Sequence, residues 1–163
     1  MRIGLDLDGT LINYNSNWLL PTAFNEDVLK ALKKRRVKSV IIITNQGGMC
    51  LGIPNKPSPE IVSMRIEYAI ERLNRSKIKV DHVYISAFHK NATIVQIKEG
   101  ASAVNLSVPF TVFRDEIYRK PSPEMLKVAK LTEYWGDSKE DQEASISARV
   151  NFVEVKRFEY EYV

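Results

Sequence analysis

Short apolar runs along the chain predict a set of buried strands. The run "IGLDL" (3–7) ends at two aspartates, and "SVIIIT" (39–44) is rich in β-branched residues. Continuous apolar runs of this kind are typical of parallel strands that are buried on both faces. We expect further strands in the segments "VDHVYISAF" (80–88), 108–114, the beginning of "YWGDS" (134–138) and "FVEV" (152–155).

Helix signals occupy the stretches between these runs. Asn25 can cap a helix with acidic residues in its first turn and basic residues 33–36 in its last, the charge order that the helix dipole favours. Ser58-Pro59-Glu60 predicts a helix start, and the apolar stripe behind it continues to about residue 75. The sequence also predicts a helix that begins at Ser122-Pro123-Glu124 and another over residues 139–149.

The alternation of strands and helices predicts an α/β fold, with a doubly wound, mostly parallel sheet in one domain that spans residues 1–163. In such sheets, ligands bind at the carboxyl ends of the strands. We therefore expect one site from the polar residues that follow the predicted strands, which are Asp6, Asp8, Thr44, Asn45 and Asp137.

The composition narrows the class of protein. A chain of 163 residues with 44% hydrophobic and 27% charged residues fits one globular domain with a buried core. The net charge of +4 suits a polyanionic or phosphorylated ligand, although a solvated basic surface is the simpler explanation for most of these charges. The single cysteine, Cys50, excludes an internal disulfide and a multi-cysteine zinc site.

The sequence favours an intracellular protein, cytoplasmic or nuclear, that does not bind membranes. The N-terminus has no basic stretch followed by a long apolar segment, as a signal peptide would. The longest apolar run, around "VIIIT" (40–44), is too short to cross a bilayer. Nothing in the sequence sets the oligomeric state.

Two aspartates at the end of a buried strand point to chemistry. Asp6 and Asp8 repel each other, and burial adds a desolvation cost to that repulsion. Either a cation neutralises the pair, or one carboxyl is protonated while the other is not.

Three further segments carry groups that suit a phosphate and a metal ion. Thr44 offers a hydroxyl, Lys120 an ammonium, and Asp137 and Asp141 in "GDSKED" (136–141) offer the oxygen ligands that Mg²⁺ takes. Each group also has an ordinary explanation: a turn at Thr44, a solvated loop lysine at Lys120, and helix capping at residues 137–138.

The segments "DLDGTL", "TNQGG", "RKPSPEM" and "GDSKED", in this order, resemble the four motifs of the haloacid dehalogenase superfamily of phosphotransferases and phosphatases. The resemblance implies a Rossmann-like fold and phosphoryl chemistry through an aspartyl-phosphate. It implies that Asp6 attacks phosphorus and that Asp8 protonates the leaving oxygen and later activates water. Thr44 would hold the transferring phosphoryl group, and Lys120 would balance charge.

The same resemblance implies a Mg²⁺ cofactor and a set of binding residues. The implied metal ligands are Asp6, the Asp8 backbone carbonyl and Asp137, with Asp141 ligating or orienting from close by. We expect Gly9 and Asn45 to bind substrate, together with the basic residues Arg114 and Arg119 near the predicted site.

Larger members of this superfamily carry a separate cap domain, and the spacing of the motifs here leaves too little chain for one. Two branches without a cap domain use the segments "TNQ" and "RKP". The histidinol-phosphate and heptose-bisphosphate phosphatases carry a zinc loop of Cys and His before the lysine motif. This sequence has only Cys50, which lies elsewhere, and His82 and His89 alone cannot form such a loop. The segment "VPFTVFRDEIYRKPSPEM" (108–125) is more similar to the polynucleotide 3′-phosphatases, which are often fused to a kinase in DNA repair. An extra strand-like segment predicts an insertion or a flap at about 88–117, and without a P-loop the chain carries no kinase of that type.

Basic and aromatic residues could contact a nucleic acid. Arg114, Arg119, Lys90 and Lys98 are candidates for phosphate contacts, with ordinary surface charge as the alternative. The aromatic residues of "VKRFEYEYV" (155–163) could stack bases, but a half-buried edge strand explains the alternation of Phe158, Tyr160 and Tyr162 better.

The sequence thus predicts a Mg²⁺-dependent phosphomonoesterase that removes 3′-phosphate from DNA or RNA ends. One alternative is a small-molecule phosphatase of the histidinol or sugar-phosphate type that lacks the zinc loop. Another is a non-catalytic module that binds phosphate or nucleic-acid ends.

Overall fold

One parallel sheet organises the part of the chain that the structure, a computed structural model, describes, namely residues 1–14 and 22–159. Its six strands are β1 (Ile3–Leu5), β2 (Ser39–Asn45), β3 (Lys79–Ser86), β4 (Phe110–Phe113), β5 (Glu133–Gly136) and β6 (Asn151–Glu154). They lie in the order β4-β3-β2-β1-β5-β6, and every neighbouring pair is parallel. The predicted α/β fold with a doubly wound sheet is confirmed.

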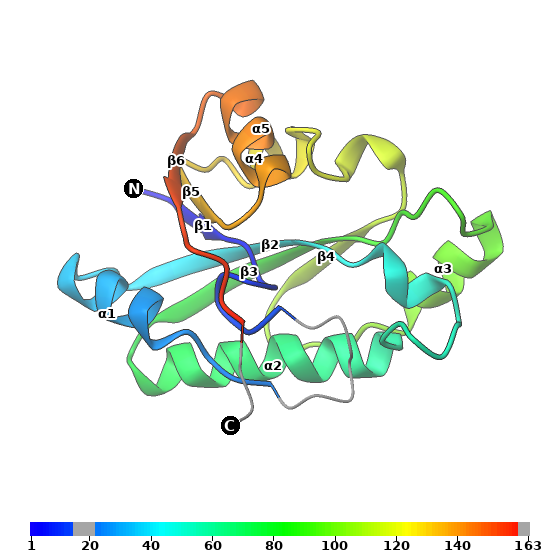
Figure 1. The fold of residues 1–163 in the computed structure, drawn as a ribbon, viewed down its shortest axis with the longest axis horizontal. Coiled ribbons are helices and arrows are strands. Elements are labelled where there is room, and N and C mark those ends of the chain that lie inside the picture. The colour runs from blue at the N-terminus through cyan, green and yellow to red at the C-terminus, as the bar shows by residue number, and fades with distance from the viewer. Residues whose placement is uncertain (15–21, 160–163) are drawn as a thin grey trace.

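Helices cover both faces of this sheet (Figure 1). They are α1 (Glu26–Lys34), α2 (Pro59–Arg75), α3 (Ile94–Ser102), α4 (Glu124–Val128) and α5 (Lys139–Ala148), with short 3₁₀ helices η1 (Gly47–Cys50) and η2 (Glu116–Tyr118). In the part of the chain that the structure describes, no helix combines the length and the apolar character that a membrane span needs.

The alternation of side chains along β2 divides the core into two clusters, one on each face of the sheet. Val40 and Ile42 pack with buried residues of α1, α2 and α3, whereas Ile41 and Ile43 pack with those of α4 and α5. Because successive residues of a strand point to opposite faces, one apolar run serves both clusters.

Local capping explains why the predicted helices begin where they do. The Ser58 side chain accepts a hydrogen bond from the backbone N–H of Ile61, and α2 covers the predicted range. The Asn25 side chain accepts from the N–H of Asp27 at the start of α1. The predicted start of α4 is also confirmed, but Ser122 does not cap it, because its hydroxyl donates to the carbonyl of Ile117 instead.

The first strand is shorter than the sequence predicts. The expected strand covers residues 3–7, but β1 ends at Leu5. The Leu7 carbonyl accepts backbone hydrogen bonds from Thr10, Leu11 and Ile12, so the chain turns tightly here. Asp6 therefore stands at the strand end and Asp8 lies within the turn.

Residues 88–117 extend the sheet. Helix α3 contributes Ile97 and Ala101 to the core, and β4 pairs with β3 at the edge of the sheet. This segment is therefore packed into the fold, while the expected insertion or flap stays a prediction.

The topology directs the loops after β1 and β5 toward one place. From β1 the chain builds outward through β2, β3 and β4, then returns to the other side of β1 to add β5 and β6. The connections that leave the neighbouring strands β1 and β5 thus run to opposite faces. Such a switch point opens a crevice at the carboxyl ends of the strands.

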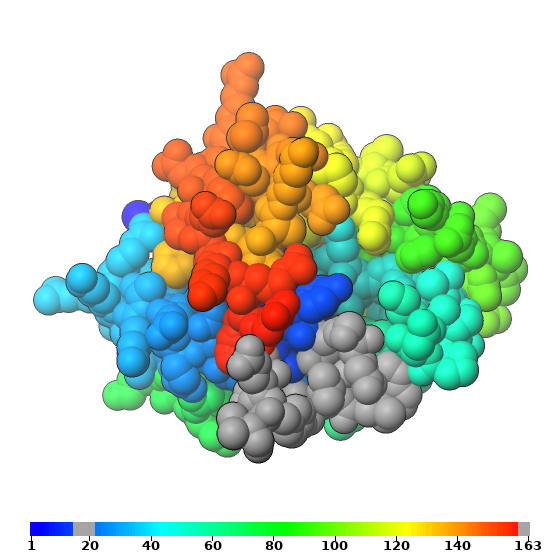
Figure 2. Space-filling view, in the orientation of Figure 1, coloured from blue at the N-terminus to red at the C-terminus, as the bar shows by residue number. Residues whose placement is uncertain are grey.

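The segment after β6 lies against the loop that follows β1, as the red and blue surfaces in Figure 2 show. The backbone N–H of Phe158 donates to the Gly9 carbonyl at 2.8 Å, and the Tyr14 N–H donates to the Phe158 carbonyl at 2.8 Å. The N–H of Val155 still donates to the carbonyl of Gly136 in β5. The prediction of an edge strand is wrong for residues 156–159, because the backbone of Phe158 pairs with a loop rather than with a strand. Tyr160 and Tyr162 lie outside the described residues.

Candidate active site

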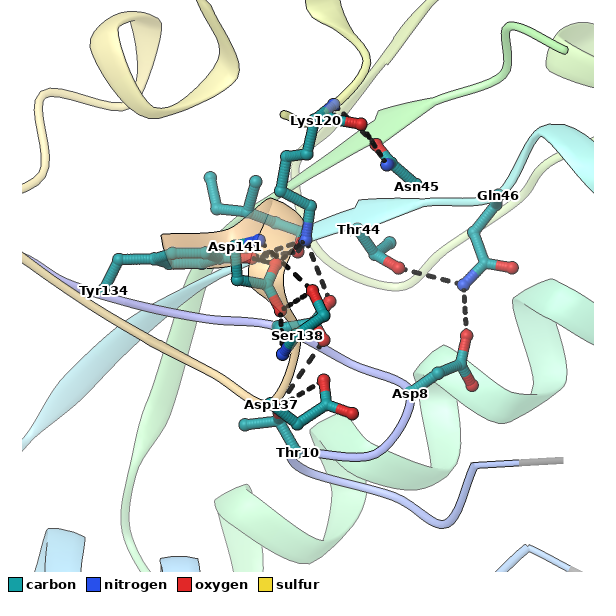
Figure 3. Close-up of polar contacts among 12 residues, drawn as sticks. Asp8, Thr10, Thr44, Asn45, Gln46, Lys120, Tyr134, Asp137, Ser138 and Asp141 are labelled. Carbon is teal, nitrogen blue, oxygen red and sulfur yellow. Dashed lines mark hydrogen bonds and ion pairs between the residues drawn. The ribbon is translucent and has the colours of Figure 1, made fainter. Parts of the chain in front are cut away.

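The carboxyl edge of the sheet brings side chains from distant segments into one cluster (Figure 3). Asp6 follows β1, Thr44 ends the apolar run of β2, and Lys120 precedes α4. Asp137 follows β5, and Asp141 lies in the first turn of α5. These residues line a cavity of about 330 Å³, which Asp8 lines as well.

Lys120 is the centre of this cluster. Its side chain is buried, and Nζ donates to Asp6 Oδ1 at 3.0 Å, to Asp141 Oδ1 at 2.6 Å and to the Tyr134 hydroxyl at 2.6 Å. Burial alone would lower the pKa of Lys120, but the carboxylates of Asp6 and Asp141 outweigh it and raise this pKa above its usual value. Lys120 is therefore a fixed cation.

Asp141 combines a structural and an electrostatic function. Its Oδ2 accepts from the backbone N–H of Ser138, and the Asp141 N–H donates to the Ser138 hydroxyl oxygen, so the two residues form a capping box at the start of α5. The Ser138 hydroxyl also donates to Asp141 Oδ2. Burial acts to raise the pKa of Asp141, but the charge of Lys120 and the bonds from Lys120 and Ser138 lower it overall. Asp141 is thus held as a carboxylate that positions Lys120.

Asp6 carries the least compensated negative charge of the cluster. Burial is the main cause that raises its pKa well above the usual value, and the charges of Asp141 and Asp137 add to this effect against the attraction of Lys120. A bound cation would favour the ionised form of Asp6.

The carboxylates fit a divalent metal ion. One oxygen each from Asp6, Asp137 and Asp141 lies within 4.8 Å of the other two, a spread that a single ion can span. Carboxylate oxygens are the ligands that Mg²⁺ prefers. Both Asp141 oxygens accept short hydrogen bonds, at 2.6 Å and 2.8 Å, whereas one oxygen of Asp6 and one of Asp137 accept, among the described residues, only a long bond from the Thr10 hydroxyl, at 3.5 Å and 3.4 Å. Asp6 and Asp137 are therefore the better placed ligands.

Glycine at position 9 makes room for Asp137. Gly9 has a φ of +81°, and a Cβ atom there would lie 2.2 Å from Asp137 Oδ2. Asp137 also accepts from the Thr10 hydroxyl at 3.4 Å and from Arg157 Nε at 2.9 Å. The substrate-binding role expected of Gly9 stays a prediction.

The Asp8 side chain points away from those of Asp137 and Asp141 and has other partners (Figure 3). Arg65 Nη2 donates to Asp8 Oδ1 at 2.8 Å, and Gln46 Nε2 donates to Asp8 Oδ2 at 2.8 Å. Gln46 also donates to the Thr44 hydroxyl at 2.9 Å, which links Asp8 to Thr44. A metal role for Asp8 through its backbone carbonyl stays a prediction.

The remaining substrate-binding candidates lie in different settings. The Asn45 side chain donates from Nδ2 to the Lys120 carbonyl and accepts at Oδ1 from the Lys120 N–H, both at 3.0 Å. This side chain therefore holds the backbone of Lys120 in place. Arg119 lines the cavity and donates to the Phe88 carbonyl. Arg114 and Lys98 are exposed, and neither lines the cavity that contains Asp6.

Sequence reasoning missed the partners that position these groups, namely Arg65, Gln46, Tyr134 and Arg157. Arg65 had a visible signal, because it stands on the apolar stripe of α2 between Val62 and Ala69. A charged residue at a buried helical position needs a partner. No comparable signal marks Arg157, whose contact with Asp137 depends on the path of the chain after β6.

Comparison with protein-family models matches residues 3–148 to the family described as polynucleotide kinase 3 phosphatase. The matched range contains every residue of the cluster around Lys120 and excludes Arg157. Comparison with curated proteins finds no match.

Proposed function

The chain belongs to the polynucleotide kinase 3 phosphatase family, and we propose that it removes 3′-phosphates from nucleic-acid ends in a Mg²⁺-dependent reaction. The observation that carries this proposal is the buried Asp6–Lys120–Asp141 cluster at the carboxyl edge of the sheet. A role in DNA repair inside the cell belongs to the same proposal, since its substrate is a phosphorylated nucleic-acid end.

Asp6 is the proposed nucleophile. Its carboxylate attacks the phosphorus, the bond to the 3′-oxygen breaks, and an aspartyl-phosphate forms. Lys120, 3.0 Å from Asp6, offsets the negative charge that gathers as carboxylate and phosphate approach each other. Thr44 stands at the end of β2 beside this pair, where its hydroxyl can donate to a phosphoryl oxygen.

Asp8 is the proposed acid and base. It gives its proton to the departing 3′-oxygen, and afterwards it takes a proton from the water that attacks the aspartyl-phosphate. The second step releases inorganic phosphate and restores Asp6. Arg65 donates a hydrogen bond to one oxygen of Asp8 and Gln46 donates to the other, and these two bonds fix the direction of the carboxyl group.

A divalent cation would be held by Asp6 and Asp137, with Asp141 beside them. When bound, it supplies positive charge that neutralises the carboxylates and the phosphate.

Phosphate release from matched oligonucleotides tests the proposed function. We expect rapid, Mg²⁺-dependent release from a 3′-phosphate, little from a 5′-phosphate, and none after chelation with EDTA. Sugar and amino-alcohol phosphates serve as comparison substrates. Equal or faster turnover of these small esters would favour the small-molecule phosphatase, and no turnover of any substrate would favour the binding module.

Arg65→Met tests whether the direction of the Asp8 carboxyl group matters. Without the guanidinium, Asp8 loses one of the two hydrogen bonds that fix its carboxyl group. We therefore expect kcat to fall about 10- to 100-fold with little change in KM. Arg75→Met is the matched control, because Arg75 lies exposed on the same helix and pairs only with Glu71 among the described residues. A kcat that does not change in Arg65→Met would remove Arg65 from the mechanism.

A further inference from the structure

The two glycines of "TNQGG" (44–48) leave room for cationic side chains beside the active site. A Cβ atom on Gly47 would lie 2.1 Å from the Phe88 carbonyl oxygen and 3.1 Å from Arg119 Nη1, and one on Gly48 would lie 3.3 Å from Lys56 Cδ. The proposed chemistry uses Thr44 of this motif but gives the glycines no role. They let Arg119 and Lys56 lie directly against the backbone of η1.

His89 adds a third basic group, and Lys56, His89 and Arg119 together form a surface that we call the cationic wall. The backbone N–H of Asn91 donates to His89 Nδ1 at 3.0 Å, so the neutral ring carries its proton on Nε2. Burial lowers the pKa of His89, and the charges of Arg119, Lys56 and Lys90 lower it further. These neighbours create a positive potential that a bound anion would relieve.

Among the described residues, no carboxylate forms an ion pair with the cationic wall. The arginine and lysine residues of the active site, Arg65, Lys120 and Arg157, each pair with a carboxylate. Within residues 1–14 and 22–159, no ion pair engages Lys56, Lys90 or Arg119. Arg119 donates one amino group to the Phe88 carbonyl, and its guanidinium has further N–H donors.

The cationic wall opens directly onto the active site. Lys56, His89 and Arg119 line a cavity of about 420 Å³, within the size range of small-ligand pockets. This cavity and the one that contains Asp6 share four lining residues, which are Asp8, Tyr14, Asn45 and Arg119. A ligand whose terminal phosphate lies at Asp6 can therefore extend into the cavity that Lys56, His89 and Arg119 line.

We propose that Lys56, His89 and Arg119 form a second phosphate site, which binds the phosphodiester on the 5′ side of the terminal, 3′-phosphorylated nucleotide. The inference rests on the proposed function and deepens it. The second site makes the enzyme prefer a nucleic-acid strand over a nucleoside 3′-monophosphate, because the monophosphate carries no phosphate on its 5′ side. Charge-assisted hydrogen bonds of this kind are strong enough to change KM about 10-fold each.

Three substrates isolate the contribution of the second phosphate. They are a nucleoside 3′-monophosphate, a 3′-phosphorylated dinucleotide, and the same dinucleotide with a neutral methylphosphonate linkage. For the wild-type protein we expect a KM at least about 10-fold lower for the charged dinucleotide than for the other two. Lys56→Met and His89→Gln should each raise that KM about 10-fold, with kcat and the KM for the neutral dinucleotide unchanged.

Lys98→Met is the control, because Lys98 is exposed on α3 and lines neither cavity. If the wild-type protein treats the charged and neutral dinucleotides alike, or if the variants weaken both equally, the second phosphate site does not exist. If no 3′-phosphate is released from any of the three substrates, the proposed function fails and this inference fails with it.

Discussion

Asp6→Asn is expected to reduce phosphate release by roughly 10⁴-fold or more, because the variant has no nucleophile. The same change should leave thermal stability without Mg²⁺ unchanged or higher. Burial and the charges of Asp141 and Asp137 raise the pKa of Asp6 well above its usual value, so its ionised form is unfavourable in the folded protein. A neutral amide of the same shape removes that cost. Initial rates and the melting temperature, measured on the same preparation, test both expectations.

Acid quenching during turnover adds a direct test of the intermediate. The intact mass of the wild-type chain should then include a phosphorylated species, and that of Asp6→Asn should not. Asp81→Asn, a change on β3 outside the cavity that contains Asp6, should behave like the wild type in every measurement. Turnover by Asp6→Asn at a rate near that of the wild type would show that the nucleophile lies elsewhere.

The sequence predicts well those features that depend on neighbouring residues. Helix α2 begins and ends where its cap and its apolar stripe indicate, since both are local. The convergence of Asp6, Thr44 and Asp137 was also predictable, because parallel strands place their carboxyl ends at one edge of the sheet.

Contacts between distant segments were beyond such reasoning. Arg65 meets Asp8 because α2 packs beneath the turn after β1, and no spacing in the sequence encodes that distance. Periodicity suggested a strand around Phe158, yet its backbone bonds the carbonyl of Gly9. Phe158 is partly buried, as the sequence predicts, but its partner could not be predicted.

The glycines of the "TNQGG" segment illustrate a third case. A turn explains them from the sequence alone. The structure gives them a more specific reason, because Gly47 lies against the Phe88 carbonyl and Arg119, and Gly48 lies against Lys56. A glycine that admits another residue's side chain cannot be recognised before the fold brings that residue close.

Lys120→Met is expected to lower the free energy of unfolding by about 3–5 kcal/mol and to abolish turnover. The apolar side chain leaves the buried carboxylates of Asp6 and Asp141 without their shared cation, and uncompensated buried charges are strongly destabilising. Urea denaturation without Mg²⁺ measures this loss. Lys127→Met on α4 is the matched control, because Lys127 is exposed and pairs at the surface with Glu124.

Two further experiments distinguish an electrostatic cause of the stability loss in Lys120→Met from a packing defect. The double variant Lys120→Met/Asp141→Asn should recover part of the stability, because it removes one of the unpaired charges. Mg²⁺ should stabilise Lys120→Met by binding the carboxylates in the folded state only. Neither change should restore turnover, since the charge beside the Asp6 nucleophile is still missing. A variant that is as stable as Lys127→Met would show that Lys120 does not compensate these carboxylates.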